Sequence, residues 1–236
     1  MNTIDPRAIV HLPVSGKTEL LFLLFHGVGG QASNMAPLAA ALRDQYPQAA
    51  IVSLNGPDAF DGMADAGGFQ WFSALGVTDM NRGERVDAAM PAFIARVRVW
   101  AAHFALDWPM VALGGFSQGA IMALEAVQAE PNLAGRVIAV GSRYAYVPQH
   151  APQGVCIHLL HGTADAVLSY RLAVDAANAL VAEGADVTAD VLPGIGHELH
   201  PKLVDKAMEQ LRTFIPARLW REAVVAAAEQ DKGTKH

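Results

Sequence analysis

The sequence has few cysteines, few charges and no long apolar segment. A single cysteine, Cys156, among 236 residues excludes an internal disulfide and favours a reducing compartment. Lysine and arginine number 17 against 23 acidic residues and are scattered, so the net charge of −6 argues against a nucleic-acid partner. The longest strongly apolar run, Leu20 to Phe25, is far too short to span a bilayer.

The N-terminal segment lacks the signature of a secretory leader. Residues 1–17 contain no basic start followed by an apolar stretch, so we expect no signal peptide. A hydrophobic content of 52% with 17% charged residues indicates a compact globular protein rather than a disordered one. We therefore expect a cytoplasmic protein without stable membrane insertion, folded as a single domain over residues 1–236.

Short apolar runs alternate with amphipathic stretches, which is the pattern of a parallel sheet covered by helices. Strands are predicted at Ala8–Leu12, Leu20–Phe25, Ala50–Leu54, Met110–Leu113, Val137–Val140, Val155–Leu160 and Thr188–Leu192. Helices are predicted at Asn34–Gln45, Asn81–Phe104, Ala120–Val127, Ser169–Glu183, Lys202–Phe214 and Pro216–Gln230. Pro91 is expected to kink or restart the second helix. The fold class is therefore α/β, with a mostly parallel central sheet flanked by helices.

The segment Gly115-Phe116-Ser117-Gln118-Gly119 fits Gly-x-Ser-x-Gly, the motif of a nucleophile elbow. A predicted strand leads into it and a predicted helix leads out, which is the context that this motif requires. A serine hydroxyl is a weak nucleophile until a neighbouring base deprotonates it, and a tight turn presents it clear of the backbone. The alternative is a glycine-rich turn with an incidental serine. The flanking elements favour Ser117 as a nucleophile.

An elbow serine needs a base, and the base needs an acid that orients it. After such an elbow the chain order is acid and then histidine, each on a loop that follows a strand. Asp165 follows the strand predicted at 155–160, and His197 follows the strand predicted at 188–192. We therefore predict Ser117 as the nucleophile, His197 as general base and then acid, and Asp165 as the orienting acid.

Other histidines and acids compete for these roles. His158 and His161 lie on or beside a strand, where we expect packed, hydrogen-bonded structural residues. His26 closes a strand before a glycine loop and is expected to make a structural hydrogen bond. The remaining candidates, His200, Asp175, Asp186 and Asp190, fall where such side chains normally face water.

The oxyanion that develops during acyl transfer needs hydrogen-bond donors. One is the backbone N–H of Gln118, directly after the nucleophile, and the second is expected in the glycine loop at 26–30, where the N–H of Val28 is the candidate. The alternative is that these glycines only form a turn. Metal chemistry is not favoured, because the histidines in His197-Glu198-Leu199-His200 are three residues apart and Pro201 follows at once. We predict no metal and no cofactor.

The segment from Gly56 to Gly76 is a long, glycine-rich stretch without a predicted element. Loops longer than about 12–15 residues in compact domains are usually functional or disordered, and the many large apolar side chains here argue against disorder. We expect Phe69, Trp71 and Phe72 to contribute to a substrate pocket, with a purely structural cover as the alternative.

These segments resemble a known family. The shared features are Leu24-Phe25-His26-Gly27-Val28-Gly29, Trp71-Phe72, Gly115-Phe116-Ser117-Gln118-Gly119-Ala120, His161-Gly162-x-x-Asp165 and Gly196-His197. The chain resembles the phospholipase/carboxylesterase family of α/β-hydrolases, which includes the acyl-protein thioesterases, and within it a small bacterial esterase branch. The resemblance covers roughly Leu20 to Phe214, and it implies an α/β-hydrolase fold without a large cap domain, cofactor-free hydrolysis of esters or thioesters, and the same triad and oxyanion donors.

Two departures bear on substrate preference. Gly30 stands where thioesterase members usually have an acidic residue, and Ala166 stands where proline is common. Both leave the catalytic groups intact, but they weaken the inference of acyl-protein thioesterase activity.

We therefore expect a serine carboxylesterase that hydrolyses short- to medium-chain esters through an acyl-serine intermediate. The alternatives are an acyl-protein or small-molecule thioesterase, and a non-catalytic relative that binds a ligand. The presence of all three triad candidates favours an enzyme with a small-molecule ester or thioester substrate. The last predicted helix carries Leu219, Trp220, Val224 and Val225, a face that would support a homodimer or pack on the domain.

Overall fold

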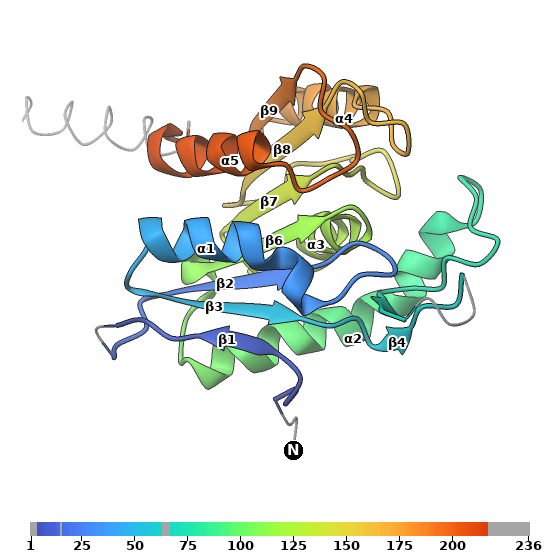
Figure 1. Ribbon diagram of the computed structural model, residues 1–236. Coiled ribbons are helices and arrows are strands. Elements are labelled where there is room, and N and C mark those ends of the chain that lie inside the picture. Colours follow the sequence, from blue (N-terminus) through green and yellow to red (C-terminus); the bar gives the residue numbers. More distant parts are fainter. Residues whose placement is uncertain (1–3, 15, 63–66, 217–236) are drawn as a thin grey trace, which may run out of the picture.

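The computed structural model describes residues 4–14, 16–62 and 67–216, and it contains a seven-stranded sheet in the order β1-β3-β2-β6-β7-β8-β9 (Figure 1). The strands are β1 (Ile9–His11), β2 (Leu20–Phe25), β3 (Ala49–Leu54), β6 (Val111–Phe116), β7 (Arg136–Val140), β8 (Cys156–Gly162) and β9 (Asp186–Leu192). All neighbours pair in parallel except β1, which runs antiparallel to β3 at the edge of the sheet. A separate short pair joins β4 (Asp58–Ala59) and β5 (Phe69–Gln70).

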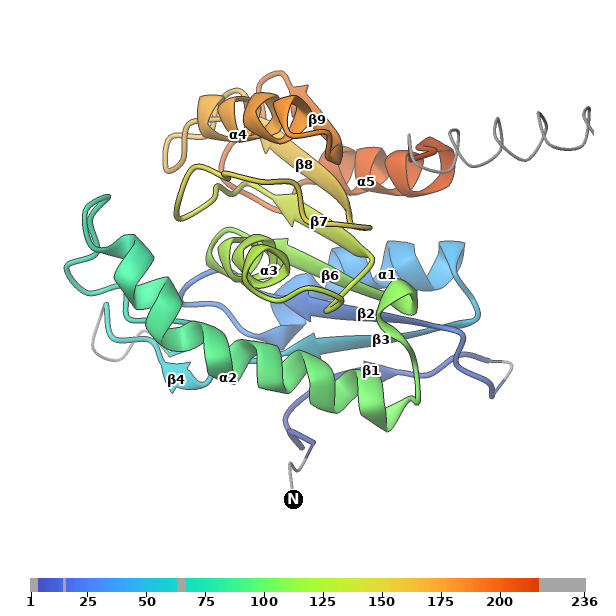
Figure 2. The same ribbon diagram turned by 180° about the vertical axis from the view of Figure 1, so that it is seen from behind.

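Helices cover both faces of this sheet. They are α1 (Ala36–Gln45), α2 (Arg82–His103), α3 (Gln118–Ala129), α4 (Arg171–Ala182) and α5 (Pro201–Thr213), with two short 3₁₀ helices, η1 (Ala32–Met35) and η2 (Trp108–Met110). Figure 1 shows α1 and α5 on the near face, and Figure 2 shows α2, α3 and α4 on the opposite face. The two buried clusters divide in the same way.

Strand β2 shows why the central strands are apolar throughout. Successive side chains of a strand point to opposite faces of the sheet. Leu21 and Leu23 pack in the cluster under α2, α3 and α4, whereas Phe22 and Leu24 pack in the cluster under α1 and α5. A strand covered on both faces therefore reads as an unbroken apolar run, which is how this one is recognisable in the sequence.

The predicted α/β class with a mostly parallel sheet is confirmed, and most elements differ from their predicted bounds by only a few residues. The described residues between β3 and α2 contain only the β4–β5 pair and irregular chain, so they contain no large cap domain. The predicted restart at Pro91 is wrong, because α2 is unbroken from Arg82 to His103. Pro91 and Asp87 are both exposed, so water can reach the Asp87 carbonyl, which has no helical donor because proline lacks an N–H.

Two further predictions concern the chain after α5 and the membrane. The helix predicted from Pro216 and its apolar residues at 219–225 lie outside the described residues, apart from Pro216 itself. In the described part of the chain, no helix combines the length and the apolar character that crossing a membrane requires.

A buried histidine in β8 should make the fold sensitive to acid. His158 is fully buried, its Nδ1 lies 2.9 Å from Thr188 Oγ1, and its ring packs edge-on against Phe214. Burial, together with the nearby positive charge of Arg136, lowers the pKa of His158 to about 3. An unfolded histidine takes up a proton below about pH 6.5, so the stability that His158 contributes is present above that pH and is lost as the pH falls from 6.5 towards 3.

Replacing His158 with leucine should therefore flatten the pH dependence of stability. Between pH 8 and pH 5 the wild type should lose about 2 kcal/mol of unfolding free energy through this residue, and His158→Leu should not. Urea denaturation at the two pH values measures the difference. Replacing the exposed His150 with leucine is the matched control and should leave the wild-type difference in place. An equal pH dependence in wild type and His158→Leu would contradict the prediction.

Candidate active site

Ser117 occupies the turn between the end of β6 and the start of α3, with φ 51° and ψ −118°. A positive φ at a residue with a side chain costs about 1–3 kcal/mol, so neighbouring groups must hold it. The N–H of Ser117 donates to Val140 O at 3.0 Å, and the Ser117 carbonyl accepts from Ser142 Oγ at 2.9 Å. The strained turn therefore presents the Ser117 side chain at the carboxyl edge of the sheet.

Glycines on both sides allow this turn to pack closely. A Cβ on Gly115 would lie 2.5 Å from Ala120 Cα, inside the first turn of α3. A Cβ on Gly119 would collide with the carbonyl oxygen of Phe25 at the end of β2. Both glycines are therefore required by close backbone approach, as the elbow motif predicts.

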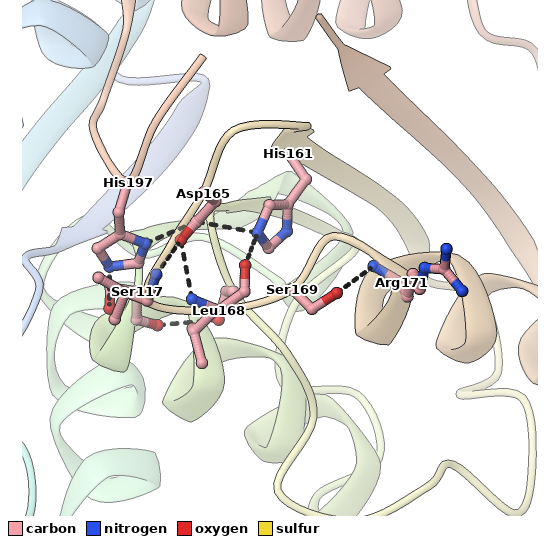
Figure 3. Close-up of polar contacts among 9 residues, drawn as sticks. Ser117, His161, Asp165, Leu168, Ser169, Arg171 and His197 are labelled. Carbon is pink, nitrogen blue, oxygen red and sulfur yellow. Dashed lines mark hydrogen bonds and ion pairs between the residues drawn. The ribbon is translucent and has the colours of Figure 1, made fainter. Parts of the chain in front are cut away.

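The structure brings three residues from separate loops into one hydrogen-bonded row (Figure 3). His197, after β9, places Nε2 2.9 Å from Ser117 Oγ and Nδ1 2.7 Å from Asp165 Oδ2, after β8. The Phe116 ring lies 4.9 Å from the His197 ring, centroid to centroid. Because the imidazole touches a hydroxyl on one side and a carboxylate on the other, this row can move a proton from the hydroxyl and stabilise the resulting imidazolium.

The carboxylate of Asp165 is almost completely enclosed, with a side chain that is 1% exposed. Its Oδ1 accepts from the backbone N–H groups of Val167 at 2.9 Å and Leu168 at 2.8 Å. Burial alone would raise the pKa of Asp165, but the backbone donors of Leu168 and Val167 and the side chain of His197 together hold this pKa below its ordinary value. Asp165 therefore carries its negative charge over the whole neutral range.

The glycine loop at 26–30 abuts the elbow. A Cβ built on Gly27 would lie 3.3 Å from Ser117 Cβ, which places this loop beside the serine. The Gly27 carbonyl accepts from His26 Nδ1 at 2.6 Å and from the Gly30 N–H at 3.0 Å. The C=O and N–H of a trans peptide point in opposite directions, so these two donors also fix the direction of the Val28 N–H. In the described part of the chain, neither the Val28 N–H nor the Gln118 N–H donates to a protein acceptor.

His26 holds this loop through a defined tautomer. The backbone N–H of Gly56 donates to His26 Nε2 at 2.9 Å, so the ring proton sits on Nδ1 and donates to the Gly27 carbonyl. Burial lowers the pKa of His26, which keeps the ring neutral. The His26 carbonyl in turn accepts from Trp71 Nε1 at 2.9 Å. The expectation of a structural hydrogen bond at His26 is confirmed.

The segment that contains Phe69, Trp71 and Phe72 is tied to both the glycine loop and the elbow. Gln118 Oε1 accepts from the Trp71 N–H, and Gln118 Nε2 donates to the Phe72 carbonyl, each at 2.8 Å. Phe69 pairs through its backbone with Gly29 and Gly30. Phe69 is half-buried, and Trp71 and Phe72 are buried. This segment therefore braces the site.

Trp71 also borders a cavity. Its volume is about 220 Å³, and its other lining residues are Pro57, Asp58, Ala89, Ala92, Phe93, Arg96 and Met122. Ligand pockets for drug-sized molecules usually measure about 300–1,000 Å³, so this space suits a small group. Across the described residues, no three histidine, cysteine, aspartate or glutamate side chains gather as a metal site would require.

Sequence reasoning missed two contacts of the site. His161 is packed and hydrogen-bonded as expected, with 1% exposed, but one of its two partners is the carboxylate of Asp165 at 3.0 Å, and the other is the Leu168 carbonyl at 2.9 Å. Ser142, on the loop after β7, was not singled out, although it holds the Ser117 carbonyl. The spacing of four residues between His161 and Asp165 was the available signal for the first contact, whereas the second joins segments 25 residues apart.

The sequence matches the phospholipase/carboxylesterase family over residues 8–217. It is 43% identical over 206 residues to esterase YpfH of Escherichia coli (strain K12), which covers 87% of this chain and 88% of that protein. Among solved structures, esterase PE8 superposes with a TM-score of 0.80 at 26% identity, covering 88% of this chain and 98% of that one.

Two more distant structures share the fold. The carboxylesterase of Bacillus cereus has a TM-score of 0.72 at 20% identity, covering 88% of this chain and 94% of its own. Acyl-protein thioesterase 2 of Zea mays has a TM-score of 0.69 at 20% identity, covering 87% of this chain and 97% of its own. The chain therefore belongs to the phospholipase/carboxylesterase family of α/β-hydrolases and is a carboxylic ester hydrolase.

Proposed function

We propose that the chain is a serine carboxylesterase that acts through an acyl-enzyme, with Ser117 as nucleophile, His197 as general base and acid, and Asp165 as the orienting acid. The observation that carries this proposal is the unbroken row from Ser117 Oγ through both imidazole nitrogens of His197 to Asp165 Oδ2, with distances of 2.9 and 2.7 Å. The strained φ at Ser117 supports it, because such backbone strain concentrates at active sites.

The reaction runs in two matched halves. His197 Nε2 accepts the hydroxyl proton while Ser117 Oγ bonds to the acyl carbon, and the carbonyl oxygen becomes an oxyanion. The bond to the leaving alcohol or thiol then breaks, the leaving group takes the proton from His197, and the acyl group remains on Ser117. Water next gives a proton to His197 and attacks the acyl carbon, and the proton returns to Ser117 Oγ as the acid departs.

We propose the backbone N–H groups of Val28 and Gln118 as the donors to the oxyanion. The contact of Gly27 with Ser117 and the fixed Gly27–Val28 peptide support the first donor. The position of Gln118 at the start of α3, where backbone N–H groups lack helical partners, supports the second. Each such donor typically contributes about 2.7–4 kcal/mol to the transition state.

For the substrate, we propose uncharged esters with short to medium acyl chains. We propose that the acyl chain binds in a pocket bordered by Phe69, Trp71 and Phe72. The hydrogen bonds from Gln118 and from the glycine loop support this proposal, because they hold the apolar segment 69–72 beside Ser117. A thioester of similar size is the alternative, since the same row of residues cleaves either bond. Residence in the cytoplasm and a homodimer stay predictions from composition and from residues 219–225.

A panel of substrates tests the proposal. We expect hydrolysis of p-nitrophenyl esters from acetate upwards, with kcat/KM highest for short or medium chains and falling towards decanoate. A fluorophosphonate should label Ser117 and abolish the activity. Thioesters of the same acyl chains measure whether the enzyme prefers a thioester. An ester that carries a phosphate group tests whether charged substrates are disfavoured. Faster hydrolysis of the phosphate-bearing ester than of the uncharged esters would overturn the substrate proposal, and activity without labelling at Ser117 would overturn the acyl-enzyme.

A further inference from the structure

His161 sits beside the proposed triad without belonging to it. It lies near the end of β8 with 1% of its side chain exposed. Its Nε2 is 3.0 Å from Asp165 Oδ2 and 2.9 Å from the Leu168 carbonyl oxygen (Figure 3). An ionised carboxylate and a carbonyl only accept hydrogen bonds, so His161 Nε2 carries a proton and donates it to both.

The other nitrogen of the same ring shows that His161 is a neutral donor. His161 Nδ1 is buried and has no hydrogen-bond partner among the described residues. A bare lone pair is tolerable there, whereas a second N–H would be a buried donor without an acceptor. The ring therefore contributes one N–H to Asp165 and no positive charge.

The two histidines share one oxygen of the carboxylate. His197 Nδ1 and His161 Nε2 both bind Asp165 Oδ2, at 2.7 and 3.0 Å, whereas Oδ1 is occupied by the backbone donors of Val167 and Leu168. The negative charge on Oδ2 is thus divided between the imidazole that is proposed to react and one that touches neither Ser117 nor solvent.

We propose that His161 is a positioning residue that aims Asp165 Oδ2 at His197 and limits how strongly Asp165 attracts the imidazolium. The proposal rests on the proposed triad and deepens it. A hydrogen bond to a carboxylate disperses its charge, so Asp165 holds the protonated form of His197 less tightly than it would with one imidazole partner. Loss of the His161 donor should therefore strengthen the hold of Asp165 on protonated His197.

Among the described residues, the charged side chains on the strands beside β8 are Arg136, Asp186 and Asp190. Arg136 and Asp186 lie level with Cys156 at the far end of β8, and Asp190 accepts a hydrogen bond from Gln210. His161, on β8, adds to the row formed by Ser117, His197 and Asp165. The buried positions of α4, namely Ala173, Ala176, Ala177 and Leu180, are not titratable. The same holds for those of α5, which are Leu203, Val204, Ala207, Met208 and Leu211. The guanidinium-bearing Arg171 contacts this region through its backbone N–H, which donates to Ser169 Oγ. A change in the pH profile on replacing His161 therefore reports on Asp165 and His197.

The experiment compares His161→Leu with His161→Gln in the full chain. Leucine removes the donor, whereas the amide nitrogen of glutamine reaches the position of His161 Nε2 and restores it. We expect His161→Leu to lower kcat by about 10-fold and to move the acid limb of the kcat/KM profile upwards by about 0.5–1 pH unit, the equivalent of one lost hydrogen bond. His161→Gln should return the limb to the wild-type position.

The controls distinguish a failure of the role proposed for His161 from a failure of the proposed triad. Fluorophosphonate labelling of Ser117 measures the concentration of active enzyme, and kcat is calculated from that concentration. Partial unfolding of a variant is therefore not mistaken for a lower kcat. If the leucine variant fails to fold, His161→Asn replaces it, because its amide is too short to reach the Nε2 position, and the same shift is expected. An acid limb that stays at the wild-type position, or that moves equally in the Gln variant, overturns the role of His161. A wild type that is active but not labelled at Ser117 overturns the triad instead.

Discussion

Replacing Ser117 with alanine should reduce kcat/KM for ester hydrolysis by about 10⁶-fold, the typical result of removing the nucleophile from such a triad. The fold should tolerate the change, because the side chain of Ser117 has one protein partner, His197 Nε2, in the described part of the chain. The free energy of unfolding should therefore stay within about 0.5 kcal/mol of the wild type. Hydrolysis of p-nitrophenyl esters and urea denaturation measure the two quantities.

Two further variants make this result specific. Ser117→Gly should be equally inactive but more stable than Ser117→Ala by about 1 kcal/mol, because glycine adopts the φ of 51° without strain. Alanine at the exposed Ser33 is the matched control and should keep wild-type activity. Substantial ester hydrolysis by Ser117→Ala would disprove the acyl-serine mechanism.

Replacing Asp165 with asparagine should reduce kcat by about 10⁴-fold although the two side chains have almost the same shape. Both oxygens of Asp165 accept hydrogen bonds, one from Val167 and Leu168 and the other from His161 and His197. An amide offers one acceptor and one donor, so its NH₂ must face N–H groups in either orientation. If the NH₂ group faces His197, then His197 Nδ1 must accept a hydrogen bond from it and the ring proton sits on Nε2. In this tautomer Nε2 cannot accept the proton of Ser117.

This variant should also be less stable, unlike Ser117→Ala. Two N–H groups that face each other in a buried site, with no acceptor for either, lower the free energy of unfolding by about 1–3 kcal/mol. Rates of fluorophosphonate labelling report the loss of serine activation, and urea denaturation reports the loss of stability. Asp175→Asn, at an exposed position of α4, should change neither. An Asp165→Asn enzyme within 10-fold of the wild-type kcat would show that another acid orients His197.

The strands that are buried on both faces can be recognised from the amino-acid sequence alone. Strand β2 appears at its predicted bounds, because only a strand covered on both sides needs so continuous an apolar run. Strand β6 was predicted to end at Leu113 but continues to Phe116. Gly114 and Gly115 have little strand propensity, and they continue the strand because Leu24 and α3 pack directly against them. That packing is a tertiary property.

The order of the motifs likewise led to Ser117, Asp165 and His197, because each loop that follows a parallel strand opens at the same edge of the sheet. The two variants above test the roles assigned to these residues. The hydrogen bond from His161 to Asp165 and the clamp of Gln118 on Trp71 and Phe72 appeared only in the tertiary structure. A sequence pattern indicates which segments are buried and where strands end. Hydrogen bonds between side chains depend on rotamers and on the approach of distant segments, and only the packed fold decides these.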